Sequence, residues 1–234
     1  MRMNLTVNDI AGMIDLSCVR TYSSRQDILE LVENAKKFNF GQVSVMQCFL
    51  PLTKELVRDF PQIHIIGNVS FPSGSDSTNV KVFQTRELVA AGCDEVDVVL
   101  NVAYLRSGMD AEAAEDVKAV IAAAGGLPVK VIIEVSYLTP AEVERACHIC
   151  VDCGATFVKT GTGWAEKGTT VEDIKLIRSI VGDRIKITSS GGIRNLDTLL
   201  EMYKHGARRF GVNLKSGLAI VEECLARGGS VEIN

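Results

Sequence analysis

The chain lacks long hydrophobic runs and any surplus of positive charge. Its 234 residues include 25 Lys and Arg against 29 Asp and Glu, which gives a formal net charge of −4. Binding to a nucleic-acid backbone needs clustered excess Lys and Arg, so no nucleic-acid partner is expected. No stretch approaches the roughly eighteen apolar residues of a membrane span, and the first residues, MRMNLTVNDIAGMIDLS, lack a long apolar signal segment. We therefore expect no membrane partner and a cytoplasmic location.

Histidine is scarce, and none of the three is well placed for catalysis. His64 opens a predicted strand, while His148 and His205 lie on predicted helices. This placement disfavours a Ser-His-Asp hydrolase.

The seven cysteines are an odd number in a chain with no export signal, which indicates reduced thiols rather than a disulfide framework. Cys147, Cys150 and Cys153, with His148 between them, suggest a metal site at first sight. All of them fall within a predicted helix over 140–153, and no second Cys/His pair supplies the closing ligands of a zinc site. We interpret them as small apolar residues of a buried helix face, and predict no metal and no cofactor.

Short apolar runs alternate with segments of helical periodicity from one end of the chain to the other. Thr139-Pro140 followed by Glu142 is typical of a capped helix start, and glycines such as Gly92 and Gly154 follow a predicted helix and precede a strand. The predicted helices include 27–38, 78–92, 141–154 and 171–182. The predicted strands are 12–16, 42–46, 63–69, 95–101, 129–135, 156–160, 185–189 and 208–213.

Eight strand-helix units without a linker predict a single α/β domain, a (β/α)₈ barrel (TIM barrel) over residues 1–234. The alternative, an open Rossmann sheet, lacks a GxGxxG motif after its first strand. In a barrel, the active site lies where the strands end at their carboxyl side. The residues at these ends are therefore the candidates for function.

Lys159 lies at the end of the predicted strand 156–160, where an unpaired ammonium is costly to bury. A lysine amine in its neutral form attacks carbonyl carbons, and the resulting Schiff base withdraws electrons from an adjacent carbon-carbon bond. Asp97, on the strand 95–101, is a candidate for moving the protons. The alternatives are an ion pair between Lys159 and an interior carboxylate such as Glu134, and a purely hydrogen-bonded Asp97.

Two glycine-rich loops follow the late strands: Gly161-Thr162-Gly163 and Ser189-Ser190-Gly191-Gly192. Consecutive exposed N–H groups bind anions, and barrels commonly hold phosphate around their last two strands. The pair of loops predicts a small phosphorylated substrate. Arg194 and Lys215 either add positive charge there or are solvated surface residues.

The chain resembles the deoxyribose-phosphate aldolases, class I aldolases on a (β/α)₈ barrel, over nearly its whole length. The matching stretches include MIDLS, VKVIIEVSYLTPAEV, FVKTGTGWAEKGTTVEDIKLIRSIVG and SSGGIRNLDTLLEMYKHGARRFG. By this resemblance, Lys159 is the Schiff-base lysine, Asp97 relays protons, and Gly163, Gly191 and Gly192 bind the phosphate. Further expected contacts to the substrate come from Thr160, Ser190 and Ser216.

One departure from the family concerns a second lysine that favours the neutral form of the first. The family pattern resembles V-K-A-S-G-G-I-R, whereas this chain has I-T-S-S-G-G-I-R, with Thr188 in place of that lysine. Lys186 lies two residues earlier on the same side of the strand, about 6.6 Å deeper. The sequence leaves two readings open: Lys186 reaches up to Lys159 as a substitute catalytic lysine, or it forms an interior ion pair with Glu134.

Other departures from the family affect the substrate site. This chain has VSVMQ where the family has VCVNP, GVNLKSG where the family has a serine-rich segment, and FVKTGTG where the family has FVKTSTG. Three hypotheses follow. The first is a cofactor-free lyase that converts 2-deoxyribose 5-phosphate to glyceraldehyde 3-phosphate and acetaldehyde. The second is the same chemistry on another phosphorylated sugar or aldehyde, and the third is a catalytically silent, phosphosugar-binding regulator. The sequence leaves formation of a homo-oligomer open.

Overall fold

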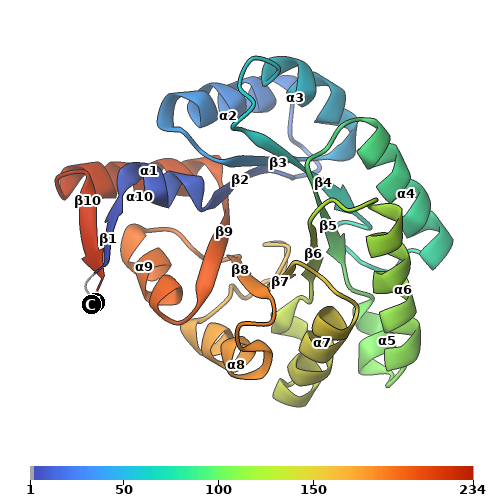
Figure 1. Ribbon diagram of the computed structural model, residues 1–234. Helices are drawn as coiled ribbons and strands as arrows, with labels where there is room; N and C mark the ends of the chain where they lie inside the picture. The colour runs from blue at the N-terminus through green and yellow to red at the C-terminus, as the bar shows by residue number, and fades with distance from the viewer. Residues whose placement is uncertain (1–2, 234) are drawn as a thin grey trace.

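The computed structural model describes residues 3–233, in which eight parallel strands close into a barrel with helices around it (Figure 1). Neighbours in the sequence are neighbours in the barrel, and the last strand pairs with the first. The prediction of a (β/α)₈ barrel is confirmed. Its strands are β2 (Ile14–Cys18), β3 (Gln42–Val45), β4 (His64–Val69), β5 (Glu95–Val99), β6 (Val129–Ile132), β7 (Phe157–Lys159), β8 (Lys186–Ser190) and β9 (Ala207–Asn213).

Local sequence signals fix where many helices begin. The Thr139 side chain accepts a hydrogen bond from the N–H of Glu142, whose carboxylate accepts in turn from the Thr139 N–H, which is the predicted capping box. Gly92 and Gly154 have φ of 85° and 81°, as their positions after a helix require. The helices are α1 (Val7–Gly12), α2 (Arg25–Phe38), α3 (Leu50–Leu56), α4 (Thr78–Ala90), α5 (Val102–Arg106), α6 (Asp110–Ala123), α7 (Pro140–Asp152), α8 (Val171–Val181), α9 (Leu196–Lys204) and α10 (Leu214–Ala226), with short 3₁₀ turns η1 (Gln47–Phe49) and η2 (Val135–Tyr137).

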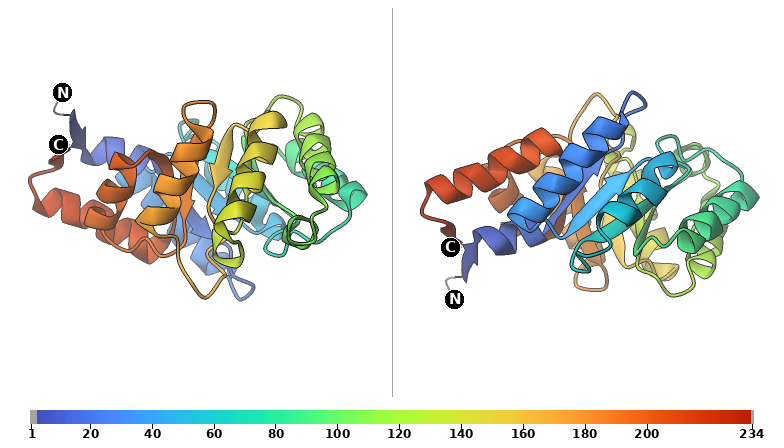
Figure 2. Two further views of the ribbon diagram at one scale, coloured as in Figure 1. Left: turned by 90° about the horizontal axis from the view of Figure 1, so that it is seen from below. Right: turned by 90° about the horizontal axis from the view of Figure 1, so that it is seen from above.

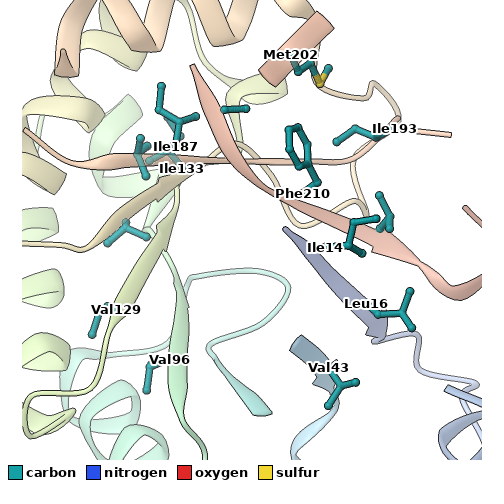
Figure 3. Packing of buried hydrophobic residues seen from close by; sticks show 14 of the residues in the cluster. Ile14, Leu16, Val43, Val96, Val129, Ile133, Ile187, Ile193, Met202 and Phe210 are labelled. Atoms are coloured by element: carbon teal, nitrogen blue, oxygen red, sulfur yellow. The ribbon is translucent and has the colours of Figure 1, made fainter. Parts of the chain in front are cut away.

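The apolar core lies between the strands and the surrounding helices. Successive strand residues point to opposite faces, so outward-facing residues such as Val96 and Val98 pack in this layer. Figure 3 shows part of it, including Val43 of β3, Val129 of β6 and Met202 of α9. The inner face of the barrel is left for the polar and charged residues that alternate with them.

Two short strands outside the barrel were not predicted from the sequence. β1 (Met3–Thr6) pairs in antiparallel fashion with β10 (Ser230–Ile233), and Figures 1 and 2 show this pair beside the ring, next to α1 and α10. The pair brings residues 3–6 and 230–233 side by side. Within residues 3–233, no helix is both long and apolar enough to cross a bilayer.

The predicted strand 129–135 is longer than the observed one. β6 ends at Ile132, and Glu134 adopts the left-handed conformation with φ of 53° before the turn η2. The direction of the Glu134 side chain is therefore set by a turn, and not by the alternation of side chains along a strand.

Candidate active site

Lys159 and Asp97, the two predicted catalytic residues, meet inside the barrel. Lys159 ends β7, Asp97 lies in the middle of β5, and the lysine Nζ is 2.5 Å from Oδ2 of Asp97. Asp97 is fully buried and Lys159 is 6% exposed. The costly burial of the ammonium is thus offset by a carboxylate.

Below this pair lies a cluster of charged residues that sequence reasoning missed. Lys130 of β6 contacts Glu95, lies 3.3 Å from Oδ1 of Asp97, and is 3.7 Å from Asp15. Arg209 of β9 lies 2.6 Å from Asp15 and 3.2 Å from Glu95. With Asp97 and Lys159, the cluster holds three carboxylates and three cations.

The cluster sets the charge states of its members. Burial alone would raise the pKa of Asp15, but the positive charges of Lys130, Arg209 and Lys159 outweigh it and hold that pKa below its usual value. Burial opposes the charged form of Lys130 as well, yet the carboxylates of Asp97, Asp15 and Glu95 raise the pKa of Lys130. The cluster therefore stabilises the charged forms of Asp15 and Lys130.

A cavity of about 530 Å³ opens above the cluster at the carboxyl ends of the strands. Its walls come from the loops after β2, β7, β8 and β9, and a second cavity of about 220 Å³ adjoins it and shares Gly163 and Gly191. Lys159 does not line either cavity. Its side chain lies next to Gly211, a residue of the larger cavity, where an added Cβ would be 3.7 Å from the Lys159 Cε.

The two glycine-rich loops touch each other at the cavity wall. A Cβ on Gly168 would lie 2.7 Å from the Cα of Gly192, and Gly163, Gly191 and Gly192 have φ of 75°, 93° and 84°. Only glycine fits this approach and these backbone angles without strain. Gly163, Gly191 and Gly192 line both cavities, as the proposed phosphate site requires.

The other predicted substrate contacts are divided between the cavity and the barrel rim. Ser190 and Ser216 line the larger cavity. Thr160 is fully buried and lines neither cavity; its hydroxyl pairs with Thr169 at 2.7 Å and accepts a hydrogen bond from the N–H of Ser190. Thr160 therefore supports the end of β8, which carries Ser190.

Glu134 is not the partner of Lys159 that the sequence left open. Its carboxylate accepts hydrogen bonds from the backbone N–H and the hydroxyl of Thr162, at 3.1 and 2.5 Å. Glu134 thus orders the loop after β7, and the ion pair of Lys159 forms with Asp97.

Lys186 is not brought to Lys159. It opens β8 at the amino end of the barrel, is exposed to solvent, and places its Nζ 5.5 Å from the ring centroid of Phe157. The residue opposite Lys159 on β8 is Thr188, which is fully buried and whose hydroxyl has no protein partner within residues 3–233. The second lysine near Asp97 is Lys130.

A cation within an apolar strand pointed to Lys159, and the same signal was present for two of the missed residues. Lys130 stands in the apolar run VKVII and Arg209 opens RFGV, each a cation within a buried strand. Arg20 was also missed: it lies in the loop after β2, lines both cavities and donates from Nη2 to the Gly163 carbonyl at 2.9 Å.

The cysteine group of α7 lies outside this site. Cys147 and Cys150 are buried, and burial raises the pKa of the Cys147 thiol to about 12. Within the described chain, no group of three His, Cys, Asp or Glu residues is arranged to hold a metal ion. The site brings together an amine, a carboxylate and two glycine-rich loops.

Comparison with known proteins agrees with this geometry. A model of the DeoC/LacD family of aldolases matches residues 16–222. The deoxyribose-phosphate aldolase of Carboxydothermus hydrogenoformans is 40% identical over 217 residues, 91% of this chain and 94% of that protein. That of Sinorhizobium medicae is 37% identical over 227 residues, 97% of this chain and 92% of that protein. A putative deoxyribose-phosphate aldolase from Coccidioides immitis has a crystal structure with TM-score 0.90 and 28% identity, covering 95% of this chain and 88% of that one.

Proposed function

The chain belongs to the DeoC/LacD aldolase family, and from this premise we propose that it cleaves 2-deoxyribose 5-phosphate to glyceraldehyde 3-phosphate and acetaldehyde through an imine at Lys159. The observation that carries the proposal is the Lys159 amine, 2.5 Å from Asp97, beneath a cavity of about 530 Å³. Cavities of roughly 300–1,000 Å³ are typical of small-molecule sites, so a pentose phosphate fits this one.

The reaction begins when the Lys159 ammonium gives a proton to the Asp97 carboxylate and the neutral amine adds to C1 of the open-chain aldehyde. Loss of water from the carbinolamine gives an iminium ion, into which the electrons of the C2–C3 bond pass as that bond breaks and the C3 hydroxyl loses its proton. Glyceraldehyde 3-phosphate departs, the remaining enamine takes up a proton at C2, and water releases acetaldehyde and restores Lys159. Asp97 contacts the reacting nitrogen and carries the protons.

The charge of the interior favours this intermediate. Asp15, Glu95 and Asp97 balance the three positive charges of Lys130, Arg209 and Lys159. An iminium ion at the Lys159 nitrogen carries the same positive charge as the ammonium, so the carboxylate of Asp97 pairs with it without any rearrangement.

The names of the relatives favour this substrate over the other two hypotheses. Those from Carboxydothermus hydrogenoformans and Sinorhizobium medicae are called deoxyribose-phosphate aldolases, and each aligns over nearly its whole length. The charged pair in the barrel supports a catalyst rather than a silent regulator. A reducing, cytoplasmic location is supported by seven free cysteines.

Trapping of the imine tests the proposal. The protein is incubated with 2-deoxyribose 5-phosphate, reduced with borohydride and mapped by mass spectrometry. We expect the adduct on Lys159 and its loss in Lys159→Met. Lys81→Met is the matched control, because Lys81 is also buried and lies 2.5 Å from a carboxylate, that of Asp116, but outside the barrel. An adduct on another lysine, or none with this sugar, would refute the proposal.

A further inference from the structure

We propose that Arg20 is a further binding residue of this site and holds the phosphate group of the substrate. The ring of Trp164 and the carbonyl of Gly163 keep the Arg20 guanidinium in place. The proposal rests on the proposed function for the identity of the substrate. It adds a charged side chain to the glycine loops, from a part of the chain that lies far from them in the sequence.

The position of Arg20 is set by two contacts across the barrel mouth. Its Cζ lies 5.0 Å from the centroid of the Trp164 ring, and its Nη2 donates to the Gly163 carbonyl at 2.9 Å. The Trp164 ring in turn packs edge-on against Phe71, with centroids 6.3 Å apart. A guanidinium over an indole face is attracted by the ring quadrupole, so these contacts hold the side chain in place.

Arg20 shares its surroundings with the expected phosphate loops. The residues that line both cavities are Arg20, Gly163, Ser190, Gly191, Gly192 and Arg194. Arg20 therefore borders the same space as the glycine loops. An anion bound there meets backbone donors on one side and a planar cation on the other.

The guanidinium retains donors for a ligand. Within residues 3–233 its side chain donates one hydrogen bond, from Nη2, and arginine has five N–H donors in a rigid fork. Phosphate oxygens accept two parallel hydrogen bonds from such a fork. The bond to Gly163 orients the side chain and leaves the other donors available.

Arg20 differs from the other two cations of the larger cavity, Arg194 and Lys215. All three cations are exposed, but in the described chain neither Arg194 nor Lys215 makes a side-chain hydrogen bond or ion pair. They would have to be ordered when a ligand binds, which weakens their contribution. Arg20 is already held by Trp164 and Gly163, so it is the cation that binds the phosphate at the lowest entropic cost.

The test compares Arg20→Gln with the wild type on 2-deoxyribose 5-phosphate and on unphosphorylated 2-deoxyribose. We expect a loss in kcat/KM of about 10- to 100-fold for the phosphorylated sugar, as for other charge-assisted hydrogen bonds, and little change for the unphosphorylated one. Trp164→Leu should lower kcat/KM for the phosphorylated sugar by a smaller factor, again with little change for the unphosphorylated one. Arg58→Gln, which changes an exposed arginine paired only with Asp59, is the matched control.

Calorimetric titration with inorganic phosphate separates this proposal from the choice of substrate. Weaker phosphate binding by Arg20→Gln than by wild type and Arg58→Gln supports the role of Arg20, whether or not the protein turns over deoxyribose 5-phosphate. Equal phosphate affinity, or an equal loss for both sugars, would overturn it. A wild type that binds phosphate through Arg20 but forms no imine would instead refute the proposed function alone.

Discussion

The carboxylate of Asp97 lies between two lysines, with Oδ2 2.5 Å from the Nζ of Lys159 and Oδ1 3.3 Å from the Nζ of Lys130. One oxygen therefore faces the amine below the cavity, and the other faces a fully buried cation that lines neither cavity. The contact with Lys130 holds the Asp97 carboxylate in a fixed orientation. The role of Asp97 in proton transfer thus depends on a residue of the neighbouring strand.

Replacing this carboxylate should abolish most of the activity. In Asp97→Asn the side chain keeps its shape but neither pairs with the iminium ion nor carries its protons, so we expect kcat to fall by about 100-fold or more. Loss of a charge between two buried lysines should also cost about 3 kcal/mol of unfolding free energy. Steady-state kinetics and urea unfolding measure the two effects.

Asp116→Asn separates the loss of activity from the loss of stability. Lys81 and Asp116 form a second buried pair with the same 2.5 Å separation, between α4 and α6. This variant should be destabilised to a similar degree and keep its kcat. A folded Asp97→Asn enzyme with wild-type kcat would show that Asp97 is only a structural partner of Lys159.

The interior cluster should make the protein sensitive to acid. Lys130, Arg209 and Lys159 outweigh the effect of burial and hold the pKa of Asp15 below its ordinary 3.8 in the folded state. The unfolded chain then binds more protons at low pH, so the stability from Asp15 is complete above pH 3.8 and is lost as the pH falls below it. Urea unfolding between pH 5 and pH 3 should therefore show a shallower loss of stability in Asp15→Asn than in the wild type. Equal slopes would contradict this expectation.

Most of the barrel was predictable because its signals are local. The eight barrel strands were found from apolar runs of five to seven residues, and helix ends from residues such as Thr139 and Gly154. The pair β1 and β10 was missed for the opposite reason. Met3–Thr6 is extended because it pairs with Ser230–Ile233 at the other end of the chain, and no local pattern reports such a partner.

Within the site, a residue was predictable when its position along one strand was enough. Lys159 and Asp97 were found in this way, and the structure brings them together. The location of Lys130 beside Asp97 depends on register between β5 and β6, which one strand cannot reveal. Arg20 was missed because its loop approaches Trp164 only after the barrel closes.

The cysteines should differ sharply in reactivity. Burial raises the pKa of Cys93 to about 11 and that of Cys147 to about 12, and buried thiols react slowly because they rarely form the thiolate. Cys48 is the exposed one. A disulfide reagent at pH 8 should label Cys48 first in the native protein, and Cys48→Ser should remove the fast phase. Fast labelling of Cys147 in the folded protein would contradict the packing of α7.

Gly211 should be required for the space beside Lys159. Its φ is not positive, so alanine fits the backbone, but the new Cβ would lie 2.6 Å from the Oγ of Ser190 and 3.7 Å from the Cε of Lys159. Displacement of Ser190 and crowding of Lys159 should lower kcat/KM by about 10-fold or more, because small misplacements near the reacting atoms are costly. The cost in unfolding free energy should be only about 1–3 kcal/mol.

Two further variants identify the cause of that loss. Gly12→Ala is the matched control, because its Cβ meets no atom within 4 Å, and it should keep full activity. Adding Ser190→Ala to Gly211→Ala removes the Ser190 Oγ, the atom closest to the new Cβ, and should restore part of the lost activity. The restoration should be partial because the Cβ of residue 190 would remain 3.0 Å from the new Cβ. Full activity in Gly211→Ala alone would mean that the Lys159 amine meets the substrate carbonyl from another side. The position of the cavity next to Gly211 would then no longer explain how the substrate reaches Lys159.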